Sequence, residues 1–404
     1  MNEETVLEAS ERFGTPLYLF DEEELLESVQ RIRRALPERV SICFAMKANP
    51  FVVGSIEAQI ERIEACSTGE MRICKLAGLP TKKLVVSGVH KDLGLEFELI
   101  GGGAQMCRYT VESVQQYEEL ERIAIALGVR VPILIRLSSG NQFGLDAEGT
   151  YRLIDRARQG ELMDMRGIQF FSGTQNLSAE RLRRELASLD AFVERLESEL
   201  ELEIAELEYG PGIPVMYFQH EGHELETTEE TQLRVLGDAL GQLRYRGKVI
   251  VEMGRAIAAT CGTYLTRVVD TKSNYGRNYA IVDGGMHQIV YYGHSMGTGL
   301  APCRFYPDRS DEGEAIWNIC GSLCTTHDVL AKQVPCGSPR LGDVIAFEKA
   351  GAYCMTEGIS IFLSRDLPRV VMVESDGRMT QVRDRLETYP INAADWENAQ
   401  FGRK

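Results

Sequence analysis

The sequence lacks an excess of positive charge. Its 404 residues include 44 Lys and Arg against 60 Asp and Glu, which gives a formal net charge of -16 at pH 7. Because no basic cluster is present to neutralise phosphates, nucleic acids and anionic membranes are not expected as partners. The chain also lacks a run of about 18 apolar residues, and its acidic start, MNEETVLEASERFG, has no apolar core of signal-peptide length. A cytoplasmic protein is therefore expected.

Cysteine is sparse as well. Ten cysteines in 404 residues are too dilute for a disulfide scaffold, and most are expected to be small buried apolar groups. Cys320, Cys324 and His327 nevertheless lie within eight positions, which raises the question of a zinc site, a disulfide or a single catalytic acid. A structural zinc site needs four ligands, and no second Cys/His pair follows at a suitable spacing, so no metal is expected. A zinc protein stays an alternative.

The chain has a regular strand and helix alternation in its first two thirds. With 44% hydrophobic and 26% charged residues it can bury a large core and form more than one domain. Between residues 40 and 258, eight short apolar segments alternate with stretches of helical period, which predicts an α/β fold, a (β/α)8 TIM barrel over residues 36–258. The predicted strands are SICFAM (41–46), RIEAC (62–66), KLVVS (83–87), AQMCRY (104–109), VPILIRL (131–137), RGIQFF (166–171), IAELEY (204–209) and KVIVEM (248–253). In one predicted helix a single face carries Leu182, Leu186, Leu189, Phe192, Leu196 and Leu200.

The pattern changes after residue 260 to short strands separated by Gly, Asn and Pro. The segments TYLTRVV, YAIVDGG, AIWNIC, DVIAFE, SIFLS and RVVMVE predict a mostly β domain that resembles a β-sandwich or β-barrel. The early segment TPLYLFD (15–21) is also predicted as a strand that pairs with this sheet. The second domain is therefore expected to contain residues 1–35 and 259–404.

The carboxyl ends of barrel strands are the usual position of functional residues. The predicted strand ends carry Lys47, Ser67, Ser87, Thr110, Arg136, SGTQ (172–175), GPG (210–212) and EMGR (252–255). Partial burial of Lys47 would lower its pKa and make its amine competent to form a Schiff base. The alternative is an ordinary surface lysine at the end of a strand.

Two glycine-bearing loops, SGTQ and GPG, follow successive strands. Bare backbone N–H groups in such loops, together with a threonine hydroxyl, can hold a phosphate, and Arg255 can supply a charged partner. Glu252 can keep a heterocyclic nitrogen protonated, which is needed if the phosphate belongs to pyridoxal phosphate. The alternative for Glu252 is an ion pair with Arg255 or Arg136.

In combination, these motifs resemble the fold-type III pyridoxal-phosphate decarboxylases that act on diaminopimelate, ornithine and arginine. The resemblance covers residues 14–375 and implies an alanine-racemase-like barrel with a C-terminal β domain joined by the N-terminal strand. FAMKANP resembles the segment that bears the cofactor lysine, here Lys47. The other cofactor contacts that the resemblance implies are Phe171, Thr174, Gly210, Gly212, Glu252, Gly254, Arg255 and Tyr353, the last from the motif GAY.

CGSLCTTHD resembles the family segment that carries the catalytic cysteine, here Cys324. In the family this cysteine reaches across a homodimer interface into the partner's barrel, so a homodimer with shared active sites is expected. The implied reaction is loss of the α-carboxylate as carbon dioxide, followed by return of a proton by Cys324 or its proton network.

Four positions depart from the family pattern. Phe171 stands where a histidine usually stacks on the cofactor, and Pro211 replaces a middle glycine. Thr325 follows Cys324 where diaminopimelate and diamine-forming enzymes place Glu or Asp to hold a distal ammonium, and Tyr291 replaces an arginine for a distal carboxylate. The residues expected to contact the substrate are Arg136, His287, Tyr291 and Thr325, with His294 as a further candidate.

A hydroxyl cannot neutralise an ammonium, so lysine, ornithine, arginine and meso-diaminopimelate are disfavoured as substrates. The resemblance is to the secondary-metabolism branch of the family. Members of that branch act on siderophore intermediates such as citryl-diamino acids, or on a carrier-protein-bound amino acid in antibiotic biosynthesis. The predicted function is decarboxylation of an α-amino acid of this kind. The alternatives are a diaminopimelate decarboxylase, an amino-acid racemase, which CGSLC disfavours, and a non-catalytic decarboxylase homologue, which the presence of Lys47 and Cys324 disfavours.

Overall fold

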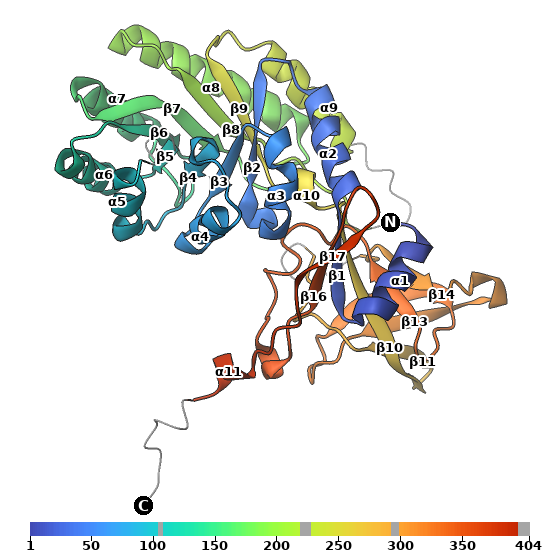
Figure 1. The fold of residues 1–404 in the computed structure, drawn as a ribbon. Helices are drawn as coiled ribbons and strands as arrows, with labels where there is room; N and C mark the ends of the chain where they lie inside the picture. Colours follow the sequence, from blue (N-terminus) through green and yellow to red (C-terminus); the bar gives the residue numbers. More distant parts are fainter. Residues whose placement is uncertain (104–107, 219–227, 292–298, 395–404) are drawn as a thin grey trace, which may run out of the picture. The chain divides into compact units, whose positions relative to one another are not determined.

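The computed structural model describes residues 1–103, 108–218, 228–291 and 299–394. The chain divides into two compact units (Figure 1). The barrel unit contains Leu26–Val215 and Leu225–Ile257, and the sheet unit contains Met1–Leu25, Met216–Glu224 and Ala258–Lys404.

The barrel unit is built on eight parallel strands that form a closed barrel, because the last strand pairs with the first. The predicted (β/α)8 barrel is therefore confirmed, although residues 104–107 of one predicted strand lie outside the described residues. The strands are β2 (Val40–Ala45), β3 (Arg62–Ala65), β4 (Leu84–Val86), β5 (Arg108–Val111), β6 (Val131–Leu137), β7 (Met163–Phe171), β8 (Glu206–Gly210) and β9 (Lys248–Met253).

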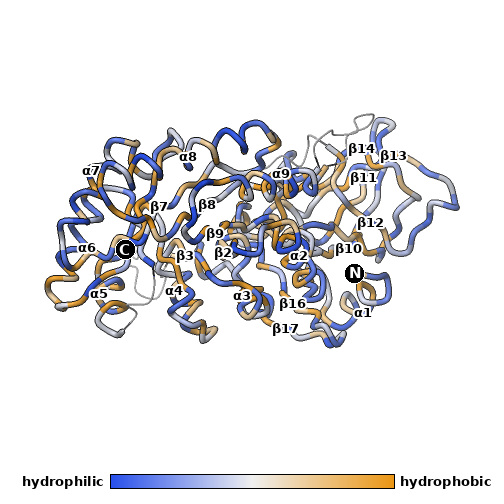
Figure 2. Tube along the Cα trace, turned by 90° about the horizontal axis from the view of Figure 1, so that it is seen from above, coloured by the Kyte–Doolittle hydropathy of each residue, from blue (hydrophilic) through white to orange (hydrophobic). Residues whose placement is uncertain are grey.

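Figure 1 shows helices around the outside of these strands. Several begin at a Ser, Thr or Asp whose side chain accepts a backbone N–H of the first turn, as Ser178 does at the start of α8. The longer helices alternate hydrophilic and hydrophobic stretches along their length (Figure 2), as expected where one face packs on the strands. The helices are α2 (Glu22–Ala35), α3 (Val53–Ile56), α4 (Thr68–Leu76), α5 (Leu93–Gly101), α6 (Val114–Leu127), α7 (Ala147–Gln159), α8 (Ala179–Leu200), α9 (Glu229–Gly241) and α10 (Arg255–Ala258).

The buried face of α8 differs from the prediction at one position. All five leucines of the predicted face are buried. Between Leu189 and Leu196, however, the buried apolar residue is Val193, and Phe192 is only partly covered. Both positions are close to the apolar stripe, so periodicity alone does not separate them.

The interior of the barrel contains both an apolar cluster and buried charges. Cys43, Val85, Leu134 and Ile250 pack together from four strands. Arg62 on β3 lies 2.8 Å from a carboxylate oxygen of Glu206 and 3.4 Å from one of Glu208, and all three side chains are buried. Charges placed on strands in this way must be paired, because an isolated buried charge is costly.

The sheet unit contains a nine-stranded sheet, in which seven strands follow the order β14-β13-β11-β10-β1-β16-β17. Of the other two strands, β15 pairs with β10, and β12 pairs with β15. The N-terminal strand β1 (Leu17–Asp21) pairs antiparallel with β10 and parallel with β16, which confirms the prediction that it joins this sheet. The unit also contains α1 (Glu3–Phe13) and α11 (Tyr389–Asn392). The remaining strands are β10 (Gly262–Asn274), β11 (Arg277–Val282), β12 (Cys303–Tyr306), β13 (Glu314–Cys320), β14 (Val329–Gly337), β15 (Val344–Phe347), β16 (Arg369–Val373) and β17 (Met379–Arg383).

The predicted strand SIFLS is wrong. Phe362–Ser364 form a 3-10 turn in which Leu363 has a left-handed backbone with φ 58°, and Ile361, Phe362 and Leu363 are exposed. Within the described ranges no strand pairs with this apolar run, and the composition of a segment does not reveal this. Among the described residues, the helices are too short or too polar to cross a lipid bilayer.

Candidate active site

Lys47 follows β2 directly, in the short turn Met46–Ala48 at the carboxyl end of the barrel. Its Nζ donates a hydrogen bond to Oε2 of Glu64 at 2.6 Å and lies 3.5 Å from Oε1 of Glu252. The side chains of Glu64 and Glu252 are only 3% and 5% exposed, whereas that of Lys47 is 38% exposed. The amine is therefore accessible and lies between two buried carboxylates.

The two carboxyl groups next to Lys47 differ in their titration. Burial raises the pKa of Glu64, but the charge and the hydrogen bond of Lys47 outweigh burial and lower that pKa overall. Burial, and then the negative charge of Glu64, raise the pKa of Glu252. Glu64 is thus the ionised partner of the amine, and the protonated form of Glu252 is favoured; the role of Glu252 at a heterocyclic nitrogen stays a prediction.

Glu64 was not predicted from the sequence. It lies on β3 two positions after Arg62, and residues two apart on a strand point to the same face. Charged residues at alternate positions of a barrel strand therefore indicate a polar interior, and this was the signal available in RIEAC.

The two glycine-bearing loops after β7 and β8 are joined by backbone hydrogen bonds. The N–H of Ser172 donates to the carbonyl of Gly210 at 3.0 Å, and that of Asn176 donates to the carbonyl of Gly212 at 2.8 Å. SGTQ and GPG therefore form one continuous edge at the carboxyl end of two neighbouring strands.

Glycine is required at both ends of GPG. Gly212 has a φ of 63°, and a Cβ atom there would lie 1.8 Å from the carbonyl oxygen of Gly173. A Cβ atom on Gly210 would lie 2.4 Å from the ring of Phe171. Among the described residues, the backbone N–H groups of Gly173, Thr174 and Gly212 find no protein acceptor. Backbone N–H groups that have no acceptor in the protein suit an anion, so the loops fit the phosphate of pyridoxal phosphate.

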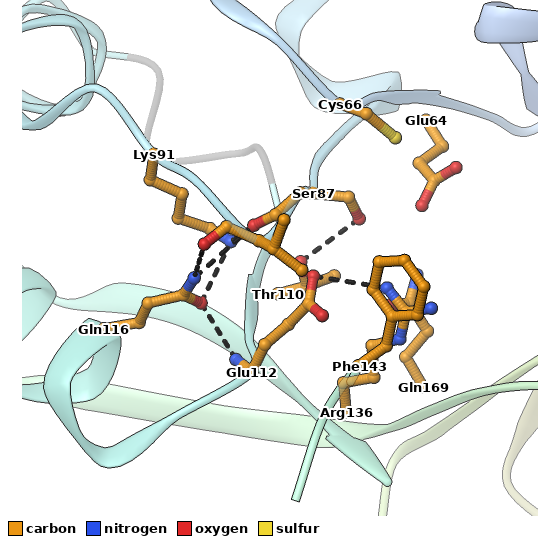
Figure 3. A network of polar contacts seen from close by, with 12 residues as sticks. Glu64, Cys66, Ser87, Lys91, Thr110, Glu112, Gln116, Arg136, Phe143 and Gln169 are labelled. Atoms are coloured by element: carbon orange, nitrogen blue, oxygen red, sulfur yellow. Dashed lines mark hydrogen bonds and ion pairs between the residues drawn. The ribbon is translucent and has the colours of Figure 1, made fainter. Parts of the chain in front are cut away.

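Arg136 is the penultimate residue of β6 and is held by two neighbours. Its guanidinium lies 3.2 Å from Oε1 of Glu112 and 4.7 Å from the centre of the Phe143 ring. Figure 3 shows this group beside Thr110 and Ser87, whose hydroxyls are hydrogen-bonded at 3.1 Å. Arg136 therefore pairs with Glu112, so the ion pair with Glu252 that was an alternative interpretation is not the one formed.

Three of the remaining predicted cofactor contacts lie at or directly after the ends of barrel strands, and the fourth, Tyr353, lies in a loop. Phe171 ends β7 and is partly covered, Gly254 follows β9, and Arg255 begins α10 with a buried side chain. Tyr353 lies in the sheet unit with a left-handed backbone, φ 65°. Residues other than Gly, Asn and Asp rarely adopt this backbone conformation. Where one does, it often lies at a functional site.

The Cys324 segment, defined as residues 320–328, connects β13 to β14 in the sheet unit. Cys324 is exposed and carries a free thiol. The other cysteines that the structure describes are also free thiols, but they are buried or partly covered. Over the described ranges, no group of three or more His, Cys, Asp or Glu side chains could hold a metal ion. The catalytic role of the Cys324 thiol stays a prediction.

Asp328 is the one carboxylate in the Cys324 segment, and it points inward. Its oxygens accept the backbone N–H groups of Met286 and Leu323, each at 2.7 Å, and its side chain is buried. Thr325 is partly covered, and its hydroxyl lies 3.4 Å from Nδ1 of His327. The segment therefore presents a thiol and hydroxyls, but no carboxylate, at its surface.

The other predicted substrate contacts are buried in the sheet unit. Burial, and then the charge of Arg365, lower the pKa of His287 to about 4, so this imidazole is neutral at pH 7. Tyr291 donates its hydroxyl to the carbonyl of Glu348. His294 lies outside the described residues. Substrate contact by these side chains stays a prediction.

A family model described as "Pyridoxal-dependent decarboxylase, C-terminal sheet domain" matches residues 17–351, most of the chain. The chain belongs to this family. The decarboxylase thus uses pyridoxal phosphate to act on an amino acid, which confirms the enzyme class and the cofactor that the sequence predicts.

The relatives of this decarboxylase include two named activities. A diaminopimelate decarboxylase from Aquifex aeolicus is 27% identical over 86% of this chain and 84% of its own length. An L-glutamyl-[BtrI acyl-carrier protein] decarboxylase from Niallia circulans is 25% identical over 93% of this chain and 92% of its own. The crystal structure of the diaminopimelate decarboxylase from M. jannaschii has a TM-score of 0.84 at 24% identity, with 96% of this chain and 94% of that chain covered, and so shares the fold.

Proposed function

We propose that this decarboxylase acts on an α-amino acid whose distal end carries no free ammonium. Two such substrates are a carrier-protein-bound amino acid and a siderophore intermediate of the citryl-diamino acid type. The observation that carries the proposal is the Cys324 segment, where Thr325 offers a hydroxyl and Asp328, the one carboxylate, is buried against backbone N–H groups.

The argument rests on the cost of an unpaired charge. An ammonium that leaves water needs a carboxylate partner, because a hydroxyl does not compensate the loss of hydration. Asp328 cannot serve without giving up two hydrogen bonds of 2.7 Å and leaving the interior of the sheet unit. A neutral, amide-like or acylated distal group carries no such cost next to Thr325.

The residues of the barrel unit are assigned by the same proposal. When bound, pyridoxal phosphate supplies an electron sink for the electrons that remain when carbon dioxide leaves. Lys47 would bind the cofactor covalently, Glu252 would share its proton with the ring nitrogen, and the N–H groups of Gly173, Thr174 and Gly212 would hold the phosphate. Glu64 would keep the proton at Nζ of Lys47 whenever that amine is released. Cys324 would return a proton to the α-carbon, in the predicted homodimer from the partner subunit.

Diaminopimelate decarboxylase is the second candidate function. Most relatives at this level of identity carry that name, and they cover most of this chain. Diaminopimelate has a distal ammonium and a distal carboxylate, so the two candidates differ in one measurable property, which is the turnover of a substrate with a distal ammonium.

A carbon-dioxide release assay of the holoenzyme tests the proposal. Free meso-diaminopimelate and L-lysine are expected to turn over poorly compared with amino acids whose distal amine is acylated, and Lys47→Ala is the inactive control. Thr325→Asp supplies the missing carboxylate and should raise kcat/KM for L-lysine about 10- to 100-fold, the effect of one hydrogen bond to a charged group. Thr325→Asn has nearly the same size without the charge and should not. Efficient turnover of meso-diaminopimelate by the unaltered enzyme would exclude the proposal.

A further inference from the structure

A large cavity opens in the sheet unit beside the Cys324 segment. Its volume is about 1030 Å³, and it is lined by residues of β11, β13 and β14 and by Cys320, Thr326 and His327 of the segment. Sites for small organic ligands typically have volumes of about 300–1,000 Å³, so this cavity has room for an elongated molecule.

The lining of the cavity is positively charged, although the chain as a whole is acidic. It includes Arg277 and Lys332 but no Asp or Glu, in a protein with a net charge of -16. No ion pair of Arg277 or Lys332 is found in the part of the chain that the structure describes, and both side chains are exposed. Two unpaired cations in a concave site attract anions, because the walls reduce the screening by water.

The other polar groups of the lining are neutral. The side-chain amides of Asn278 and Asn318 each already donate one hydrogen bond and accept one within the protein, and the side-chain amide of Gln333 adds a further donor and acceptor. A molecule that fits this lining has an anionic group for the two cations and an extended polar chain for the amides.

The cavity is connected to the residue that carries the proposed function. Nδ1 of His327 lies 3.4 Å from the hydroxyl of Thr325, and His327 is itself part of the lining. Thr325 therefore lies next to a residue of the cavity lining.

We propose that this cavity binds an extended, anionic distal part of the substrate, with Arg277 and Lys332 at its phosphate or carboxylate. The inference rests on the proposed function for the placement of the distal end at Thr325. Two sources have this chemistry. One is the phosphate-bearing arm of an acyl carrier protein, and the other is the carboxylates of a citryl group.

Calorimetric titration of the holoenzyme tests the cavity without any reaction. The probes are 4'-phosphopantetheine, citrate and inorganic phosphate. One of the two organic anions is expected to bind, more weakly at high salt, and about tenfold or more weakly in the double variant Arg277→Gln/Lys332→Gln. Arg277→Lys/Lys332→Arg keeps both charges and should retain binding, and Arg378→Gln removes an exposed charge outside the lining as a control. Binding of 4'-phosphopantetheine identifies the carrier arm, and binding of citrate identifies the citryl group.

Three results would overturn the inference. They are no binding of either organic anion at millimolar concentration, equal binding by the double variant, and inorganic phosphate binding as tightly as the organic probes. Carbon-dioxide release from a small amino acid with a distal amide separates this inference from the proposed function. That substrate has no anionic arm, so its turnover should be the same in the double variant. If meso-diaminopimelate is turned over efficiently while an organic anion binds, the proposed function fails and the assignment of the cavity as an anion site stands.

Discussion

Glu96 provides a direct test of the electrostatics of the barrel unit. This residue of α5 is 2% exposed, and neither of its carboxylate oxygens has a hydrogen-bond partner among the described residues. Burial raises its pKa to about 7, although the nearby charge of Lys91 acts in the opposite direction. Glu96→Gln keeps the size of the side chain and removes the ionisable group.

The sign of the effect follows from proton binding. The pKa of Glu96 is about 7 in the folded chain and 4.5 in the reference state, so the folded chain binds more protons between these values. The free energy of unfolding therefore falls as the pH rises through this window. One pKa unit corresponds to about 1.4 kcal/mol, so the full shift corresponds to about 3 kcal/mol. Glutamine does not ionise, and the Glu96→Gln variant should avoid this loss.

Urea unfolding at pH 4.5 and pH 8.5 measures the difference. The Glu96→Gln variant should be more stable than the unaltered protein by about 0.4 kcal/mol at pH 4.5 and by about 3 kcal/mol at pH 8.5. Glu98→Gln, on the same helix with a side chain that is 74% exposed, should show no such pH dependence. A Glu96→Gln variant that is equally stable at both pH values, or less stable at pH 8.5, would show that Glu96 is ionised and held by Lys91.

Two further substitutions test the barrel interior and the phosphate loops. Arg62→Leu leaves the buried carboxylate of Glu208 without its cation and should lower the free energy of unfolding by about 3–5 kcal/mol, measured with denaturant. The control Arg130→Leu removes an exposed ion pair and should lower the free energy of unfolding by about 0–1 kcal/mol. Similar losses for both would contradict the buried network. Gly212→Ala forces a Cβ atom against a backbone oxygen and should lower both the melting temperature and the bound pyridoxal phosphate. Gly241→Ala, which adds a methyl group in open space, should lower neither, and a normal cofactor content in Gly212→Ala would exclude the assigned loop geometry.

The barrel could be predicted because its signals are local. VPILIRL and KVIVEM coincide with β6 (Val131–Leu137) and β9 (Lys248–Met253) at both ends, since each is an apolar run bounded by turn or polar residues. The same type of apolar run led to a wrong strand prediction at SIFLS, which forms an exposed turn. Whether an apolar run becomes a strand depends on the presence of a neighbouring strand, and that is decided by the tertiary fold.

The site was predictable to the extent that it depends on strand ends. Lys47 directly follows β2 and Glu252 is the penultimate residue of β9, so both stand at carboxyl ends of strands that barrel topology brings together, whereas Glu64 stands on the shorter β3 next to a buried arginine. Glu64 was missed because it lies inside a strand, and the Arg136–Glu112 pair was missed because it joins two strands at their ends. Contacts of this second kind are set by closure of the barrel and have no signature within one segment.

The inward position of Asp328 has a consequence for how substrate preference can evolve. The hydrogen bonds of this carboxylate to Met286 and Leu323 maintain the shape of the Cys324 segment, while Thr325 points its hydroxyl toward His327. In the proposed function, shape and recognition therefore belong to different residues three positions apart. Under that proposal, a single codon change at position 325 alters which substrates are accepted while the hydrogen bonds of Asp328 keep the conformation of the loop, so new specificities are accessible without a phase of lost stability.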